Sequence, residues 1–171
     1  MSYCQSFDAI EPAEMRVLVL GSMPGVASLQ QQAYYAHPRN AFWPIMAELL
    51  NHQAWSSDFQ ARYQILQQHH IGLWDVLAEC VRPGSLDSAI QTDSIQVNDI
   101  PGLVSRHPEC KLIVLNGGKA SELFKRHILS LNKALFGELE IATLPSTSPA
   151  NARLNLQQKT DIWRDKLANF L

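Results

Sequence analysis

The sequence predicts an α/β protein: a three-layer α/β/α sandwich around a central, mostly parallel sheet of four strands. Short apolar runs bounded by turn residues alternate with segments in which apolar residues recur at helical spacing. Such alternation favours parallel strands that are covered by helices on both faces. The 171 residues, 46% of them hydrophobic, suffice for one compact core, and no repeat or linker divides them, so we expect a single domain over residues 1–171.

The first strand and the helix after it are indicated by their local patterns. The apolar run Arg16–Leu20 predicts a buried strand that enters the turn-rich loop Gly21–Gly25. Apolar residues then recur at helical spacing from Ala41 to Leu50. Asn40 suits the N-cap of this helix, and Pro44 is compatible only with its first turn. Asn40 is therefore expected at a helix start.

The middle of the chain adds a helix, a strand and an irregular segment. A helix is expected from Asp58 to about His70, with Asp58 suited to its cap. The run Leu73–Leu77 predicts a strand, which places Asp75 within it or near its end. We interpret the polar, turn-rich segment 82–101 as a long ordered excursion rather than a linker.

The last part of the chain continues the alternation of strand and helix. In a parallel sheet the loops after the strands gather at one edge, where α/β proteins bind their ligands. We therefore expect the loops that open at Gly21, Asn116 and Pro145 to lie together. The predicted elements are a short helix near Leu103–His107, a strand Lys111–Leu115, a helix from Asn116–Gly118 to about Leu129, a strand Glu140–Leu144 and a helix around Leu156–Phe170.

The loop Gly21–Gly25 could bring backbone N–H groups close to a planar ligand or an anion, because glycine permits close approach and proline fixes the turn. Its sequence is neither a GxxxxGK[ST] phosphate loop nor a GxGxxG motif. Taken alone, the loop is equally compatible with a plain connection from strand to helix.

The segment Tyr34–Trp43 has the richest mixture of functional side chains. Tyrosine can stack on an extruded base, and the Asn40 amide can hold a water molecule or read a base edge. Phe42 and Trp43 are expected to anchor the core, while Asn40 can serve both as helix cap and in the site. His37 can contact a phosphate or the leaving base, or simply pack the loop.

The charge distribution is compatible with a nucleic-acid partner but does not by itself indicate one. The net charge is −2 and the pI is near 6.3. Up to Glu109 there are 5 Lys and Arg residues against 11 Asp and Glu, whereas from Lys111 onward there are 9 against 5, so the C-terminal part is the better candidate for the phosphate-facing side. An ordinary solvated surface would show the same pattern.

Other classes of protein are disfavoured by what the sequence lacks. No apolar run approaches the roughly 20 residues that span a bilayer, and no signal-peptide pattern opens the chain, so we expect a cytoplasmic protein. Cys4, Cys80 and Cys110 are widely spaced, as is typical of buried or free thiols. The histidines show no metal-ligand spacing, so we expect no metal and no cofactor. A monomer is the default.

Several motifs, taken together, resemble one known family. They are GSMPG at 21–25, HPRNAFW at 37–43, LWDVL at 73–77, GSLDSAI at 84–90, VLNGGKA at 114–120 and PSTSPAN at 145–151. Their order and spacing resemble the uracil-DNA glycosylase superfamily, including its mismatch-specific uracil and thymine DNA glycosylases. Within it, the sequence is most similar to the hypoxanthine-DNA (deoxyinosine) glycosylase branch, and HPRNAFW is the most specific motif.

This resemblance implies cofactor-independent removal of a deaminated base from DNA. It implies a stacking aromatic at Tyr35 and a wedge loop at 146–150. Many superfamily members carry an acidic residue or asparagine where this chain has Met23, whose thioether cannot orient a hydrolytic water. The hypoxanthine branch is similar in this loss, which places the catalytic role on Asn40 and shifts the expected base from uracil to hypoxanthine.

The remaining site residues are assigned to base binding or to DNA contact. Hypoxanthine presents an oxygen and an adjacent N–H, which backbone N–H groups of the first loop and an acceptor such as Asp75 would recognise. Asp75 could equally be a structural carboxylate that caps a loop or helix, and the same holds for Asp87. The base-binding set is Ser22, Met23, Pro24, Gly25, Tyr35 and Asp75, and the DNA-binding set is Arg39, Asn116, Lys119, Ser146, Thr147, Ser148 and Pro149.

Three other interpretations stay open. The chain could be a mismatch-specific uracil or thymine glycosylase. It could also be a non-enzymatic nucleotide- or DNA-binding module on the same fold, an alternative that is supported by the absence of a water-orienting side chain at Met23. A hydrolase with a triad of Ser22, His37 and Asp75 is also conceivable, but the sequence lacks a GxSxG nucleophile elbow.

Overall fold

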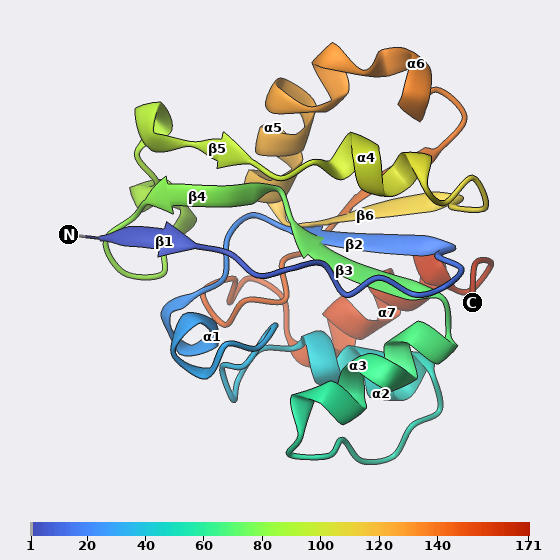
Figure 1. Ribbon diagram of the computed structural model, residues 1–171. Coiled ribbons are helices and arrows are strands. Elements are labelled where there is room, and N and C mark those ends of the chain that lie inside the picture. The colour runs from blue at the N-terminus through green and yellow to red at the C-terminus, as the bar shows by residue number, and fades with distance from the viewer. Residues whose placement is uncertain (1) are drawn as a thin grey trace.

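A four-stranded parallel sheet forms the centre of the protein. The computed structural model describes residues 2–171. The strands β2 (Val17–Gly21), β3 (Ile71–Asp75), β6 (Leu112–Asn116) and β7 (Glu140–Leu144) are hydrogen-bonded in the order β3-β2-β6-β7, and every pairing is parallel (Figure 1). The predicted α/β/α fold with a four-stranded sheet is therefore confirmed.

The two faces of this sheet are covered by different helices because alternate side chains of each strand point to opposite faces. On β2, Leu18 and Leu20 pack in one core cluster, whereas Val17 and Val19 pack in the other. The first cluster is covered by α4 (Ile100–Ser105), α5 (Gly118–His127) and α6 (Lys133–Phe136). The second is covered by α2 (Phe42–Leu49), α3 (Phe59–Gln68) and α7 (Leu156–Leu167), on the other side of the sheet (Figure 1).

Most predicted helices begin and end close to the expected residues, because their caps can be identified in the sequence. The Asp58 carboxylate accepts the Gln60 N–H at the start of α3, as predicted. Asn155 caps α7 in a reciprocal capping box with Gln158. Helix α4 begins three residues before the expected start, since Asp99 accepts the N–H of Gly102. Helix α1 (Val26–Gln31) was not predicted.

The prediction for residues 73–101 was partly wrong, because a second sheet forms there. The chain turns at Val76, whose N–H donates to the Gly21 carbonyl, so the predicted strand Leu73–Leu77 divides between β3 and β4 (Leu77–Val81). Strand β4 pairs antiparallel with β1 (Tyr3–Gln5) and β5 (Gln96–Val97). Two short 3₁₀ turns, at Asp87–Ala89 and Thr92–Ser94, account for the rest of the segment before β5.

Three further findings bear on the function. Within residues 2–171 no helix is both long and apolar enough to cross a membrane. Cys4, Cys80 and Cys110 are buried free thiols. The same stretch of chain contains no group of three or more His, Cys, Asp or Glu side chains that could hold a metal ion.

Candidate active site

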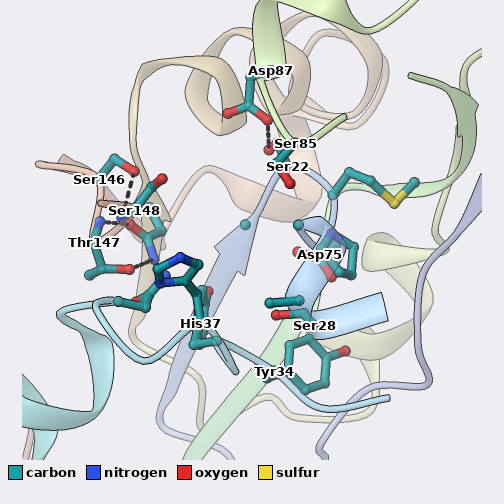
Figure 2. Close-up of a pocket in the computed structure, with 18 of the residues that line it drawn as sticks. Ser22, Ser28, Tyr34, His37, Asp75, Ser85, Asp87, Ser146, Thr147 and Ser148 are labelled. Atoms are coloured by element: carbon teal, nitrogen blue, oxygen red, sulfur yellow. Dashed lines mark hydrogen bonds between the residues drawn. The ribbon is translucent and has the colours of Figure 1, made fainter. Parts of the chain in front are cut away.

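A pocket opens where the carboxyl ends of β2, β3 and β6 meet, as the parallel topology predicts. Its volume of about 140 Å³ is well below the roughly 300–1,000 Å³ of pockets for drug-sized molecules, so it suits a single ring system. Of the fourteen predicted site residues, all but Arg39 and Lys119 line it. In Figure 2, Ser146, Thr147 and Ser148 lie on one side, Asp75, Ser28 and Tyr34 on the other, and His37 between them.

The first loop of the pocket, Gly21–Gly25, is held by contacts behind it. The Ser22 hydroxyl donates to Oδ1 of Asp87 at 2.6 Å (Figure 2), so Ser22 is not paired with a histidine as a hydrolytic triad would require. Asp87 is thus a structural partner of the loop. The Met23 side chain is only 6% exposed and belongs to the core cluster. The loop therefore offers the pocket chiefly its backbone.

Arg82, which sequence reasoning did not single out, fixes this loop. Its side chain is 1% exposed, and its guanidinium donates to the carbonyls of Pro24 at 2.6 Å, Gly84 at 2.8 Å and Met23 at 3.4 Å. A buried cation is costly unless hydrogen bonds compensate it. Binding the carbonyls from behind leaves the backbone N–H groups as the polar atoms of the loop that remain for a ligand. A charged residue between an apolar strand and Pro83-Gly84 was the available sequence signal.

Asp75 ends β3 directly beside Gly21, its register partner in β2. Its side chain is buried, and Oδ2 has no hydrogen-bond partner within the described chain. Burial raises the pKa of Asp75 to about 7, the charge of Asp87 adds to the rise, and Arg82 opposes it. A carboxylate that capped a loop or helix would have its oxygens engaged, so the geometry favours a group kept for a ligand.

Tyr35 lies beside Asp75 in an uncommon backbone conformation. Its φ of 53° is in the left-handed region, which bulky residues rarely adopt and which is enriched at functional sites. The ring stacks on Phe42, with centroids 4.3 Å apart and planes inclined by 29°. The hydroxyl is buried and lacks a hydrogen-bond partner among residues 2–171. Burial raises the pKa of Tyr35, the charge of Asp75 adds to this, and the side chain of Asn116 opposes it.

Asn40 lies next to the start of α2, as predicted, but the prediction that it is the N-cap was wrong, because Ala41 occupies that position. Its Oδ1 accepts the N–H of Phe42 at 2.9 Å, which fixes the side chain next to the pocket. The following residue, Ala41, donates its backbone N–H to the Thr147 carbonyl at 2.9 Å. The Nδ2 amino group has no hydrogen bond to another described residue, so it is the polar end of Asn40 that remains available.

The loop after β7 is tied to the end of β6. The Asn116 side chain donates to Oγ1 of Thr147 and accepts the Thr147 N–H, each at 3.0 Å, and both side chains are buried. The two residues, predicted to contact DNA, thus hold each other. Asn116 does not cap α5, because Gly117 occupies the cap position with φ of 99°. A Cβ atom added to Gly117 would be 2.9 Å from Cβ of Ser146.

Three predicted or possible contact residues lie at or beyond the rim. Arg39 is exposed and outside the pocket, and its backbone N–H donates to Nδ1 of His37. Half-buried His37 lines the pocket. Lys119 also lies outside the pocket, with Nζ 3.5 Å from Oε1 of Glu122 on the same helix.

A small pocket with a buried carboxyl, a positioned amide and backbone donors, at the carboxyl edge of an α/β/α sandwich, defines a site for a planar polar ligand. The sequence profile of the Uracil DNA glycosylase superfamily matches residues 7–167, and the chain belongs to this superfamily.

Individual relatives cover nearly the whole chain. A hypoxanthine DNA glycosylase of Methanosarcina acetivorans is 31% identical over 157 residues, which are 92% of this chain and 94% of that protein. A protein of the same description from Methanosarcina barkeri is 32% identical over 161 residues, covering 94% and 96%. A solution NMR structure from M. acetivorans, provisionally described as a uracil DNA glycosylase, superposes with a TM-score of 0.76 at 30% identity, covering 95% of this chain and 98% of that one.

Proposed function

We propose that this protein excises hypoxanthine from DNA, acting on a deoxyinosine nucleotide that is flipped out of the helix. The observation that carries the proposal is the pair of buried, unpartnered oxygens, Asp75 Oδ2 and Tyr35 Oη, in a pocket of base size. Buried polar atoms without partners are rare and costly, and a ligand that hydrogen-bonds to them removes that cost. The names of the two Methanosarcina relatives support hypoxanthine as the ligand.

Asp75 is proposed to select the base. In its ionised form the carboxylate only accepts hydrogen bonds, and hypoxanthine presents an N–H beside its carbonyl oxygen. Adenine has a lone pair in place of that N–H. Its ring nitrogen and the carboxylate oxygen would then both be acceptors, and no hydrogen bond could form between them. The backbone N–H groups of the loop that Arg82 fixes are the matching donors for the carbonyl oxygen of hypoxanthine.

Tyr35 is proposed to hold the flipped base. Phe42 covers one face of its ring, so the opposite face and the hydroxyl are the parts available for stacking and hydrogen bonding. Because the ring is already stacked and its backbone is fixed in the left-handed region, little conformational entropy is lost when the base arrives.

Asn40 is proposed as the catalytic residue. Water adds to C1′ as the C1′–N9 bond breaks; the bonding electron pair leaves with the base, and a proton from the water neutralises it. The sugar develops oxocarbenium-like charge, so the step needs orientation more than a strong base. Since Oδ1 of Asn40 is engaged by Phe42, we assign the free Nδ2 group to the departing base. Met23, buried in the core, takes no part in orienting water.

The DNA duplex is proposed to meet the loop after β7. Ser146, Ser148 and Pro149 line the rim, and the Asn116–Thr147 pair keeps this loop in place against the sheet. Such a stiff loop suits a wedge at the site that the flipped base vacates. Arg39 and Lys119, both outside the pocket, are assigned to phosphates. We further propose that residues 1–171 act as one catalytic unit and as a monomer.

The decisive experiment measures base release from labelled duplexes that carry hypoxanthine, uracil, xanthine or adenine opposite each normal base, with alkali to cleave abasic sites. Hypoxanthine should give the fastest strand cleavage. Asn40→Ala should lower the single-turnover rate by about 10²–10³-fold, the loss typical of a preorganised hydrogen-bond donor. Cleavage at uracil alone would assign the chain to the uracil- and thymine-specific members instead, and binding without cleavage of any substrate would indicate a non-enzymatic module.

A further inference from the structure

A second hollow lies on the other side of the segment that carries Asn40. Its volume is about 380 Å³, and we call it the α3 groove. It shares Tyr35, His37 and Asn40 with the base pocket, so this one segment separates the two. The rest of its lining comes mainly from the starts of α2 and α3, and includes Pro38, Trp43, Pro44, Ser57, Phe59 and Arg62.

Arg62 is held in the α3 groove in a fixed orientation. Its Cζ lies 4.2 Å from the centre of the Phe59 ring and 5.2 Å from that of Trp43. Its Nε donates to the carbonyl of Ser56 at 2.6 Å. The terminal amino groups, Nη1 and Nη2, have no hydrogen bond or ion pair with any of residues 2–171. The guanidinium is therefore held in place by its Nε hydrogen bond and by the two aromatic rings. Nη1 and Nη2 remain available to donate hydrogen bonds to a ligand.

Three other arginines of the chain already have acceptors for their guanidinium groups. Arg106 pairs with Glu11, and Arg164 pairs with both Glu48 and Asp161. The buried Arg82 is engaged by backbone carbonyls. Arg62, in contrast, faces a groove whose lining residues include no carboxylate, although the chain as a whole has a net charge of −2. An ordered guanidinium without an acidic neighbour is complementary to an anion.

The position of the groove suggests which anion it binds. The groove adjoins the base pocket through His37 and Asn40, and the start of α3 lies on the same side of the molecule as α1 and the loops at the carboxyl edge of the sheet (Figure 1). A nucleotide whose base occupies the pocket leaves its own strand at the rim of that pocket. The first anions outside the pocket are then the phosphates that flank the flipped nucleotide.

We infer that the α3 groove binds a backbone phosphate of the damaged strand next to the flipped nucleotide, with Arg62 as the residue that contacts it. This inference rests on DNA being the substrate, as proposed above. The balance of charge along the sequence favours the C-terminal part as the phosphate-facing side, whereas this site lies in the acidic N-terminal part. Its ligand is a phosphodiester, bound through the two free amino groups of one guanidinium.

The first test replaces Arg62 and measures DNA binding by fluorescence anisotropy over a series of salt concentrations. With a duplex that contains hypoxanthine, Arg62→Gln should weaken binding roughly tenfold, as expected for a lost charge-assisted contact. It should also reduce the slope of log K against log salt by about 0.9, the value for one phosphate. The control is Arg16→Gln, which removes the same charge from an exposed residue just before β2, at the amino end of the sheet. Equal effects of the two variants would overturn the inference.

The second test changes the DNA and leaves the protein intact. Single phosphates on either side of the hypoxanthine nucleotide are replaced, one at a time, by neutral methylphosphonates. One replacement should weaken binding of the wild-type protein about as much as Arg62→Gln does, and it should have no further effect on that variant. If every replacement weakens both proteins equally, Arg62 contacts no phosphate.

Two controls separate this inference from other causes. Arg62→Lys keeps the charge but not the fork, so it should restore the salt slope and only part of the affinity. Thermal unfolding of each variant shows whether loss of the contacts to Phe59 and Trp43 has disturbed the fold. Base release by the wild-type protein is measured separately. If the wild-type protein releases hypoxanthine, but Arg62→Gln and every methylphosphonate weaken binding independently of each other, the inference that Arg62 binds a phosphate is refuted. The proposed function then still stands.

Discussion

Oδ1 of Asp75 lies so close to Gly21 that a Cβ atom added to this glycine would be 2.6 Å from it. The two residues face each other at the ends of neighbouring parallel strands. The same added atom would be 3.5 Å from the Tyr35 hydroxyl. The missing side chain at residue 21 therefore creates the space in which the two unpartnered polar groups of the pocket sit.

Gly21→Ala should consequently disturb the pocket. Both the strand and the Asp75 side chain are buried, so relief of the close contact requires a shift that costs about 1–3 kcal/mol of unfolding free energy. Base release should fall as well, because Asp75 moves. Gly118→Ala is the matched control, since an added Cβ there meets no atom within 4 Å. Chemical denaturation and single-turnover rates check both variants, and a Gly21→Ala protein as stable and active as the control would contradict the prediction.

The raised pKa of Asp75 predicts a pH dependence of stability. The unfolded carboxyl ionises near 3.8 and the folded one at about 7, so the native state binds the extra proton between these values. The contribution of Asp75 is therefore fully present at low pH and is lost as pH rises towards 7. Asp75→Asn removes this titration. Its stability relative to wild type should increase between pH 4 and pH 8, as measured by denaturant unfolding, and a constant difference would refute the assigned pKa.

Base selection should follow the same ionisation. Above pH 7 the carboxylate is acceptor-only, whereas below it the protonated form can donate to the lone pair of adenine. The ratio of hypoxanthine to adenine release should therefore rise with pH in the wild-type protein. In Asp75→Asn the ratio should be lower and independent of pH in this range. Parallel single-turnover assays on the two duplexes at pH 6 and pH 8 provide the comparison.

Tyr35→Phe separates stability from function. The variant keeps the ring that stacks on Phe42 and removes a buried hydroxyl that has no partner within the described residues. Loss of such a group should stabilise the free protein by about 1 kcal/mol, within the usual penalty for an unsatisfied polar atom. Affinity for DNA with a hypoxanthine should fall, because the proposed hydrogen bond between the hydroxyl and the base is lost. A variant that is both less stable and equally tight in binding would show that the hydroxyl is satisfied in the free protein.

Arg82 is predicted to position the first loop through its hydrogen bonds. Arg82→Lys retains a positive charge but cannot reach the carbonyls of Met23, Pro24 and Gly84 together. It should raise KM for the hypoxanthine duplex more than it lowers kcat, and destabilise the fold by roughly 3 kcal/mol, since buried donors and acceptors lose their partners. Arg106→Lys, at an exposed ion pair, serves as control and should change unfolding free energy by less than about 1 kcal/mol.

The central sheet could be predicted from sequence because its information is local. Each strand is indicated by a short apolar run in the sequence. N-cap residues such as Asp58 mark the start of a helix within a few residues. The second sheet depends instead on pairing across the chain: Cys4 lies opposite Cys80 in the β1–β4 ladder. No periodicity within a short β1 segment indicates such a partner.

The candidate site likewise has features that the sequence predicts and features that only the folded structure defines. The motif residues gathered at one edge because the parallel topology brings strand ends together, so the location of the pocket followed from the strand pattern. The mutual pairing of Asn116 with Thr147, and the carbonyl contacts of Arg82, depend on side-chain geometry that only the folded chain defines. The orphaned oxygens of Asp75 and Tyr35 are likewise a property of packing rather than of residue type.

The indole of Trp163 donates to the carbonyl of Pro145, so the final helix supports the last wall of the pocket. That wall, at residues 146–149, is made long after the loop at Gly21 and Asn40 during synthesis of the chain. A fragment that ends before α7 would contain residues 146–149 but would lack the indole that binds the Pro145 carbonyl next to them. The twelve-residue helix α7 contributes no side chain to the lining of the pocket, yet it anchors the segment that closes it.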